Sequence, residues 1–235
     1  MEDVKTIGIL GYENCGEQDT ITPLEILLGA AMVLDMEHKR KLAVKLVALD
    51  GGNVKMQMGT QVVPGGRLSG DDLFDMLYVP GGVGIGALTT NSTVLDSVRR
   101  HHESGRIVAA NCSGVGLLHR AGILGDTPVT CVAAVARRLR EEGANVPQPR
   151  HMWIGDPDAR IWTATGSSGV HGSAVALVAH YFGRDVATTV SMMFDTLSHL
   201  GERIFERKGP EYFFHPELES KFQDFWEDKL LPKTN

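Results

Sequence analysis

The sequence has few cysteines, no excess of basic residues and no long apolar run. Its three cysteines, Cys15, Cys112 and Cys131, form no Cys-x-x-Cys pair, which argues against a disulfide framework and a structural zinc site. The net charge of −6 provides no basic stripe that could neutralise a nucleic-acid backbone. No apolar segment approaches the roughly 20 residues that span a bilayer, and the N-terminus lacks the layout of a secretory signal. We therefore expect a cytoplasmic protein with reduced thiols, bound to neither nucleic acid nor membrane.

The composition is that of an ordinary globular protein. Of the 235 residues, 43% are hydrophobic and 22% are charged, and no repeat or low-complexity segment interrupts them. A chain of this length can form a single α/β core. We expect one α/β domain over residues 1–200, followed by a helical extension over residues 201–235 that packs on the domain or at a dimer interface.

Short apolar runs alternate with helical patterns along most of the chain. The expected strands are 5–10, 42–49, 76–79, 106–110, 129–132 and 160–165, with a hairpin over 54–63. The expected helices begin at Thr22, Ser92, Gly114, Ala133 and Val170. This alternation predicts a mostly parallel sheet with helices on both faces, that is, a three-layer flavodoxin-like sandwich.

Two of these helices and the tail of the chain carry more specific expectations. Thr22-Pro23-Leu24-Glu25 has the capping-box pattern and predicts a helix start, with Leu24, Leu27, Leu28 and Val33 facing a core. In the helix over 133–142, Arg137, Arg138 and Arg140 are expected on the solvent side. In the tail over 216–230, the apolar residues at helical spacing predict a docked face made of Phe222, Phe225, Trp226 and Leu230.

Cys112 lies between an apolar strand and a helix, within Ala110-Asn111-Cys112-Ser113-Gly114. Small residues on both sides allow the sharp turn of a nucleophile elbow. At a helix N-terminus, free N–H groups and the partial positive charge favour thiolate over thiol. The alternative is an inert buried cysteine, which is the usual state of a free thiol.

The elbow and two further motifs resemble the ThiJ/PfpI superfamily of class I glutamine-amidotransferase-like folds, and within it the isonitrile hydratases. The likeness extends from the first strand to about residue 182. Its most specific segments are Asp19-x-x-x-Pro23-x-Glu25-Ile26-Leu27, Pro80-Gly-Gly-x-Gly-x-Gly-Ala-Leu88, and Cys112-Ser113-Gly114 with Ala121-Gly-Ile-Leu124.

The resemblance implies that Asp19 lies against the nucleophilic sulfur. A carboxyl group in that place can exchange a hydrogen bond and a proton with the thiol. Without the resemblance, the simpler interpretation is that Asp19 caps a helix.

The glycines that follow residue 80 are not a dinucleotide-binding motif, because in Gly82-Val-Gly84-Ile-Gly86 the third glycine comes one residue early. We interpret this turn as a segment whose backbone, without side chains at the glycines, can come close to the substrate. The N–H groups of Gly82 and Ser113 are the candidate oxyanion donors, and the Ser113 hydroxyl is a candidate substrate ligand.

His171 is the histidine with most promise, since it begins an apolar helix at the expected active edge and could relay protons. A structural role is the alternative for a single histidine in this position. The other histidines show no ligand spacing, so we expect neither a metal nor another cofactor.

These residues predict a cysteine-dependent hydratase or lyase acting on a small molecule. The resemblance implies isonitrile hydration to an N-substituted formamide through a thioimidate on Cys112, in a protein that forms a homodimer. A glutathione-independent glyoxalase acting on 2-oxoaldehydes would use the same residues. A non-enzymatic redox sensor, in which Cys112 is oxidised, is the third alternative.

Overall fold

The computed structural model describes residues 4–68, 73–195, 201–212 and 215–233. Its main sheet has seven strands: β1 (Thr6–Gly11), β2 (Ala43–Ala48), β5 (Gly66–Arg67), β6 (Met76–Val79), β7 (Ile107–Asn111), β9 (Trp153–Asp156) and β10 (Ile161–Ala164). Two small antiparallel pairs accompany it: β3 (Val54–Lys55) with β4 (Gln61–Val62), and β8 (Arg150–His151) with β11 (Glu211–Tyr212).

The strand order confirms the predicted fold class. The sheet runs β5-β2-β1-β6-β7-β10-β9, and every neighbouring pair is parallel except β10 with β9. The five long parallel strands thus follow the flavodoxin-like order 2-1-3-4-5, in which ligands bind beyond the carboxyl ends of the strands. The edge strand β9 was not predicted, because its short polar-flanked run lacks a clear periodicity.

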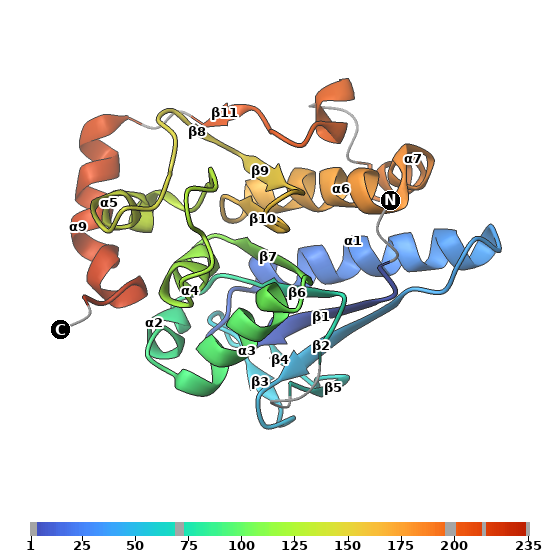
Figure 1. Cartoon of the computed structure of the whole chain (residues 1–235), viewed down its shortest axis with the longest axis horizontal. Coiled ribbons are helices and arrows are strands. Elements are labelled where there is room, and N and C mark those ends of the chain that lie inside the picture. Colours follow the sequence, from blue (N-terminus) through green and yellow to red (C-terminus); the bar gives the residue numbers. More distant parts are fainter. Residues whose placement is uncertain (1–3, 69–72, 196–200, 213–214, 234–235) are drawn as a thin grey trace.

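Helices cover both faces of the sheet (Figure 1). They are α1 (Glu17–Met36), α2 (Ile85–Leu88), α3 (Ser92–Glu103), α4 (Gly114–Arg120), α5 (Ala133–Glu141), α6 (Ser168–Phe182), α7 (Arg184–Met193) and α9 (Pro216–Leu230), with a 3₁₀ turn at Gly201–Phe205. Helices α1, α6 and α7 pack together on one face, whereas α3 and α4 lie on the other. Within the part of the chain that the structure describes, no helix has the length and apolar character needed to cross a membrane.

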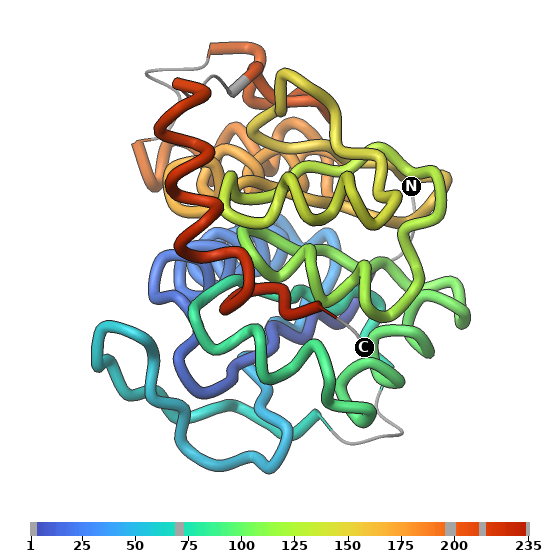
Figure 2. The backbone as a smooth tube through the Cα atoms, turned by 90° about the vertical axis from the view of Figure 1, so that its left-hand side faces the viewer, coloured from blue at the N-terminus to red at the C-terminus, as the bar shows by residue number. Residues whose placement is uncertain are grey.

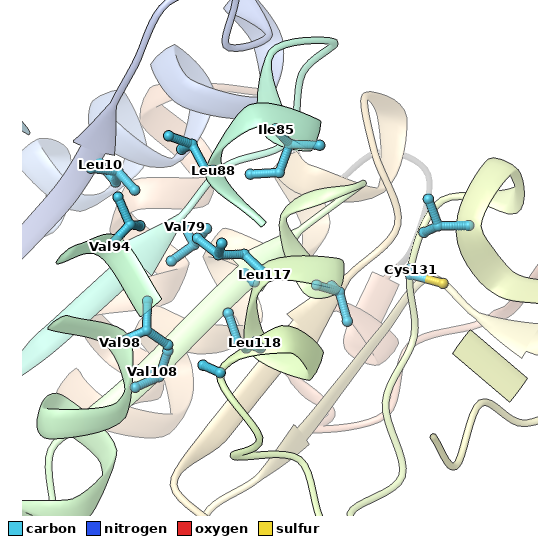
Figure 3. Close-up of a cluster of buried hydrophobic side chains, with 14 of the residues drawn as sticks. Leu10, Val79, Ile85, Leu88, Val94, Val98, Val108, Leu117, Leu118 and Cys131 are labelled. Atoms are coloured by element: carbon cyan, nitrogen blue, oxygen red, sulfur yellow. The ribbon is translucent and has the colours of Figure 1, made fainter. Parts of the chain in front are cut away.

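The core consists of two apolar clusters, one on each face of the sheet. Alternate residues of each strand enter different clusters, as the two-residue period of a strand requires. In β6, for example, Leu77 and Val79 join the cluster under α3 and α4, and Met76 and Tyr78 join the cluster under α1 and α6. Figure 3 shows the first cluster, where Leu10 and Val79 of the strands meet Val94, Val98 and Leu117 of the helices.

The first helix begins five residues before the predicted capping box. Helix α1 starts at Glu17 after Gly16. Thr22 therefore lies within the helix and is not its N-cap, and Pro23 also lies inside the helix. The acidic residues Glu17 and Asp19 occupy the first turn, where they favour a helix N-terminus. The capping box was therefore a wrong start signal, and Leu28, expected in the core, is exposed.

The segment 129–132 is not the strand that its apolar residues predicted. Residues 129–131 are buried and Val132 is half-buried, but the backbone N–H groups donate to unrelated partners, which are the carbonyl oxygens of Asn145 and Cys112 and the hydroxyl group of Thr163. In the described part of the chain no strand pairs with this segment. This segment instead brings Val132 to the carboxyl edge of the sheet.

Helix α9 packs against α5 at one end of the molecule (Figures 1 and 2). It covers the side of α5 that was predicted to face solvent, so Arg138 is only 4% exposed and pairs with Glu227 and Asp228. The buried positions of α9 are Gln223, Glu227 and Leu230, not Phe222 and Phe225, which are exposed. Of the four residues predicted to dock, Leu230 is buried and Trp226 packs on the core, so the docked face combines apolar and polar side chains. The domain boundary expected at residue 200 lies outside the described residues.

Candidate active site

Cys112 forms the turn between β7 and α4. Its φ angle of +53° is unfavourable for a residue with a side chain and marks a strained turn of the nucleophile-elbow type. The backbone N–H of Cys112 donates to the carbonyl oxygen of Ala164 at the end of β10, at 3.0 Å. The predicted elbow is confirmed, and the sulfur lies at the carboxyl edge of the central strands.

Two glycines allow the backbone to pass close to Cys112. A Cβ atom on Gly81 would lie 2.4 Å from Cβ and 2.8 Å from Sγ of Cys112, and one on Gly166 would lie 2.8 Å from Sγ. Both distances are far shorter than a non-bonded contact. Any side chain at either glycine would therefore displace the sulfur.

Asp19 lies against the same sulfur, in the first turn of α1. Its carboxyl group interacts directly with the Cys112 thiol, and its Oδ1 accepts a hydrogen bond of 3.0 Å from the backbone N–H of Ser167. The side chain is only 6% exposed. Ser167 is itself strained, with a φ of +49°. The carboxyl group therefore joins two strained turns, and it is not a helix cap because Gly16 occupies that position.

Burial governs the protonation of this pair. It raises the pKa of the Cys112 thiol well above its usual range, and the negative charge of Asp19 raises this pKa further, whereas the backbone N–H of Ser113 lowers it. Burial also raises the pKa of Asp19, against the opposing hydrogen bonds from Ser167 and Cys112. The geometry thus favours a protonated thiol beside a carboxylate, not the resting thiolate expected from the helix N-terminus.

Asn111 connects the segments that surround the sulfur. It is fully buried, its Oδ1 accepts from the N–H of Gly81 at 2.9 Å, and its Nδ2 donates to the carbonyl oxygen of Asp19 at 2.8 Å and to the Tyr78 hydroxyl at 3.1 Å. The Asp19 carbonyl is available because Pro23, four residues later, has no N–H to donate within the helix. One amide thereby positions both the carboxyl group and the glycine turn.

Gly82 and Ser113 are hydrogen-bonded to each other. The N–H of Gly82 donates to Oγ of Ser113, and the Ser113 hydroxyl donates back to the Gly82 carbonyl oxygen, both at 3.1 Å. Ser113 is almost fully buried. The N–H of Gly82 and the Ser113 hydroxyl therefore already have partners within the protein. This corrects two predictions, the oxyanion donor at Gly82 and the substrate ligand at Ser113. The two residues instead form a contact that stabilises the turn at Cys112.

The structure does not bring His171 to Cys112. The His171 ring makes an edge contact with Phe194, with centroids 6.3 Å apart, and it interacts electrostatically with Glu25 of α1. Burial lowers the pKa of His171. Its surroundings are those of a packing residue between helices, so the predicted part in substrate binding is not supported.

A cavity of about 220 Å³ opens onto Cys112. Its other lining residues come from four later parts of the chain, and they are Val132, Ala133, Arg150, Thr165, Gly166, Ser167, Ser168 and Phe222. The run 165–168 follows β10 and could have been found from its place at the carboxyl edge. Arg150 and Phe222 carry no local signal, because only the fold brings them here. Among the described residues, no three His, Cys, Asp or Glu side chains cluster as a metal site requires.

Comparisons with known proteins agree with the fold. The profile of the DJ-1/PfpI family matches residues 5–180. The isonitrile hydratase of Pseudomonas putida is 26% identical over 189 residues, covering 80% of this chain and 77% of that protein. Protein dj-1beta of Drosophila melanogaster is 28% identical over 109 residues, which are 45% of this chain and 58% of that relative.

Among solved structures, a ThiJ/PfpI family protein from Pseudomonas syringae superposes with a TM-score of 0.75. The alignment covers 98% of this chain and 93% of that protein, at 17% sequence identity. At this identity the likeness concerns the fold alone. It extends beyond the matched family segment into the carboxyl-terminal part of the chain.

Replacing Asn111 should weaken the whole fold. Asn111→Leu keeps the volume but leaves the Asp19 carbonyl and the Gly81 N–H without partners, and each unpaired buried group costs about 1–3 kcal/mol. We expect the free energy of unfolding in urea to fall by roughly 2–5 kcal/mol. Asn145→Leu is the control, because Asn145 is exposed and also donates to one carbonyl oxygen. Equal stabilities of the two variants would contradict the role given to Asn111.

Replacing Asp19 should make Cys112 easier to ionise. Asp19→Asn removes the negative charge that disfavours the thiolate, so the pKa of Cys112 should fall, and alkylation by iodoacetamide at pH 8 should become faster by up to about tenfold. Mass spectrometry of the alkylated protein over a pH series gives this pKa. Glu17→Gln, two residues away on α1, should leave it unchanged. An unchanged or higher pKa in Asp19→Asn would show that the two side chains do not interact as described.

Proposed function

The chain belongs to the DJ-1/PfpI family, and from this premise we propose that it is a cofactor-independent enzyme in which Cys112 attacks a small molecule. The reaction we propose is the hydration of an isonitrile to an N-substituted formamide. The observation that carries this proposal is the direct contact between the Asp19 carboxyl group and the Cys112 thiol at the cavity. The similarity to the isonitrile hydratase of Pseudomonas putida supports the choice of substrate.

The resting pair holds the single proton that the first step needs. As Sγ of Cys112 attacks the isonitrile carbon, the thiol proton passes to the carboxylate of Asp19. The carboxyl group then delivers this proton to the same carbon, which uses its lone pair to form the C–H bond. The product is a neutral thioimidate, R–N=CH–S, and Asp19 is a carboxylate again.

Water completes the reaction. With Asp19 as base, water adds its oxygen to the thioimidate carbon, and the nitrogen gains a proton. The C–S bond then breaks, sulfur leaves with the electron pair and regains a proton from the hydroxyl group, and R–NH–CHO is released. The balance is one isonitrile and one water for one formamide.

The elbow geometry supports these roles. The strained backbone at Cys112 and the close approach of Gly81 and Gly166 hold the sulfur in one position, and the Ser167 N–H holds the carboxyl group against it. Positioned groups of this kind contribute to catalysis because they need no reorganisation during the reaction.

The test is turnover of an aryl isonitrile and of methylglyoxal by four proteins. We expect the wild type to hydrate the isonitrile, Cys112→Ala to be inactive, and Asp19→Asn to lose about 10²–10⁴-fold in kcat as proton transfer is lost. Cys15→Ala is the control for removing a thiol elsewhere, since Cys15 is buried. Turnover of methylglyoxal without hydration of the isonitrile would favour the glyoxalase, and full activity in Cys112→Ala would refute a cysteine mechanism.

A further inference from the structure

Helix α9, which follows the segment matched by the family profile, reaches the cavity around Cys112. Two polar contacts fix it beside this cavity. Glu219 pairs with Arg150 at 3.3 Å, and the side chain of Gln223 donates to the carbonyl oxygen of Ala133 at 3.0 Å. Both Arg150 and Ala133 line the cavity. The amino-terminal half of α9 is thus held by polar contacts to two residues that line the cavity.

Phe222 lies immediately before Gln223 and is the residue of α9 that lines the cavity. Phe222 is 42% exposed, although α9 packs against the rest of the protein. The buried positions of α9 are Gln223, Glu227 and Leu230, so Phe222 is not needed to hold the helix in place. Part of its ring surface therefore faces open space at the mouth of the cavity.

The surroundings of Phe222 are apolar on the side of α5. Val132 and Ala133 line the same cavity beside it, whereas Cys112, Thr165 and Ser167 provide polar atoms on the sheet side. Among the described residues that line the cavity, Arg150 is the only cation, and it is paired with Glu219 and almost fully buried. The cavity is therefore divided into a reactive polar end and an uncharged apolar wall.

We propose that Phe222 is a specificity-determining residue, and that the cavity selects uncharged substrates carrying a flat apolar ring next to the reacting carbon. The ring of the substrate would pack on Phe222, Val132 and Ala133 while its reactive carbon meets Cys112. Flat rings pack well on an aromatic side chain. The volume of about 220 Å³ lies below the usual range for drug-sized ligands, so the substituent is a single ring. This inference relies on the proposed function only in taking Cys112 as the reacting group.

The experiment measures alkylation of Cys112 and needs no turnover. Iodoacetamide and N-benzyl iodoacetamide carry the same reactive group, and only the second carries a ring. The concentration dependence of labelling, followed by mass spectrometry with peptide mapping to Cys112, gives an efficiency for each reagent. The ratio of the two efficiencies reports recognition of the ring, because the chemistry of the sulfur cancels.

We expect Phe222→Ala to lower this ratio about fivefold through weaker binding of the benzyl reagent, and Phe222→Leu to lower it less. Phe225→Ala is the matched control, since Phe225 lies three residues further along α9, is 60% exposed and does not line the cavity. It should leave the ratio unchanged.

Two results would overturn the inference. One is an equal change in both efficiencies in Phe222→Ala, which would mean that Phe222 only obstructs the entrance. The other is the same change of ratio in Phe225→Ala. If the ratio falls as expected but the wild type hydrates no isonitrile, then the role of Phe222 in recognising a ring is supported and the proposed reaction is refuted.

Discussion

The side-chain amide of Asn111 joins the three segments on which the site depends. It binds the Asp19 carbonyl after β1, the Gly81 N–H after β6, and it directly precedes Cys112 after β7. The proline inside α1 favours this arrangement, because the missing N–H of Pro23 leaves the Asp19 carbonyl without its usual partner in the helix. A buried amide with all of these partners satisfied is favourable, whereas a partly satisfied one would be costly. The position of the carboxyl group beside the thiol therefore follows from backbone hydrogen bonding in the core.

Charge at the site follows from this burial. The first turn of α1 and the N–H of Ser113 both favour negative charge near the sulfur, but they act on a pair that is largely removed from water. Desolvation and the neighbouring carboxylate together outweigh them, and the proton stays on the thiol. A protonated nucleophile next to its own base is suited to adding H and S to one carbon, because the proton is transferred only when a substrate is present.

The fold and the pair of Cys112 and Asp19 could be predicted from the sequence, but most of the other residues that line the cavity could not. Alternating apolar runs marked most strands, and the small residues around Cys112 marked the elbow, since both patterns are local. Asp19 came from the family resemblance. The helix start at Thr22 was wrong, because α1 already begins after Gly16 with two acidic residues in its first turn. The strand at 129–132 was wrong, because the N–H groups of this segment bind partners in separate parts of the chain. Phe222 reaches the cavity through the packing of α9 against α5, and Arg150 is held there by the Cys131 carbonyl and Glu219. His171 of α6 contacts Phe194 at the end of α7, and no local pattern indicates this contact.

The central claim is that the bond to substrate forms at Cys112. Its most direct test is a single-turnover reaction with protein in excess of an aryl isonitrile, quenched in acid at successive times and analysed by peptide mass spectrometry. The account predicts a transient increase equal to the mass of the isonitrile, on the peptide containing Cys112, which disappears as the formamide is formed. Formamide production with Cys112 unmodified at every time, or with the added mass on Cys15 or Cys131, would contradict it.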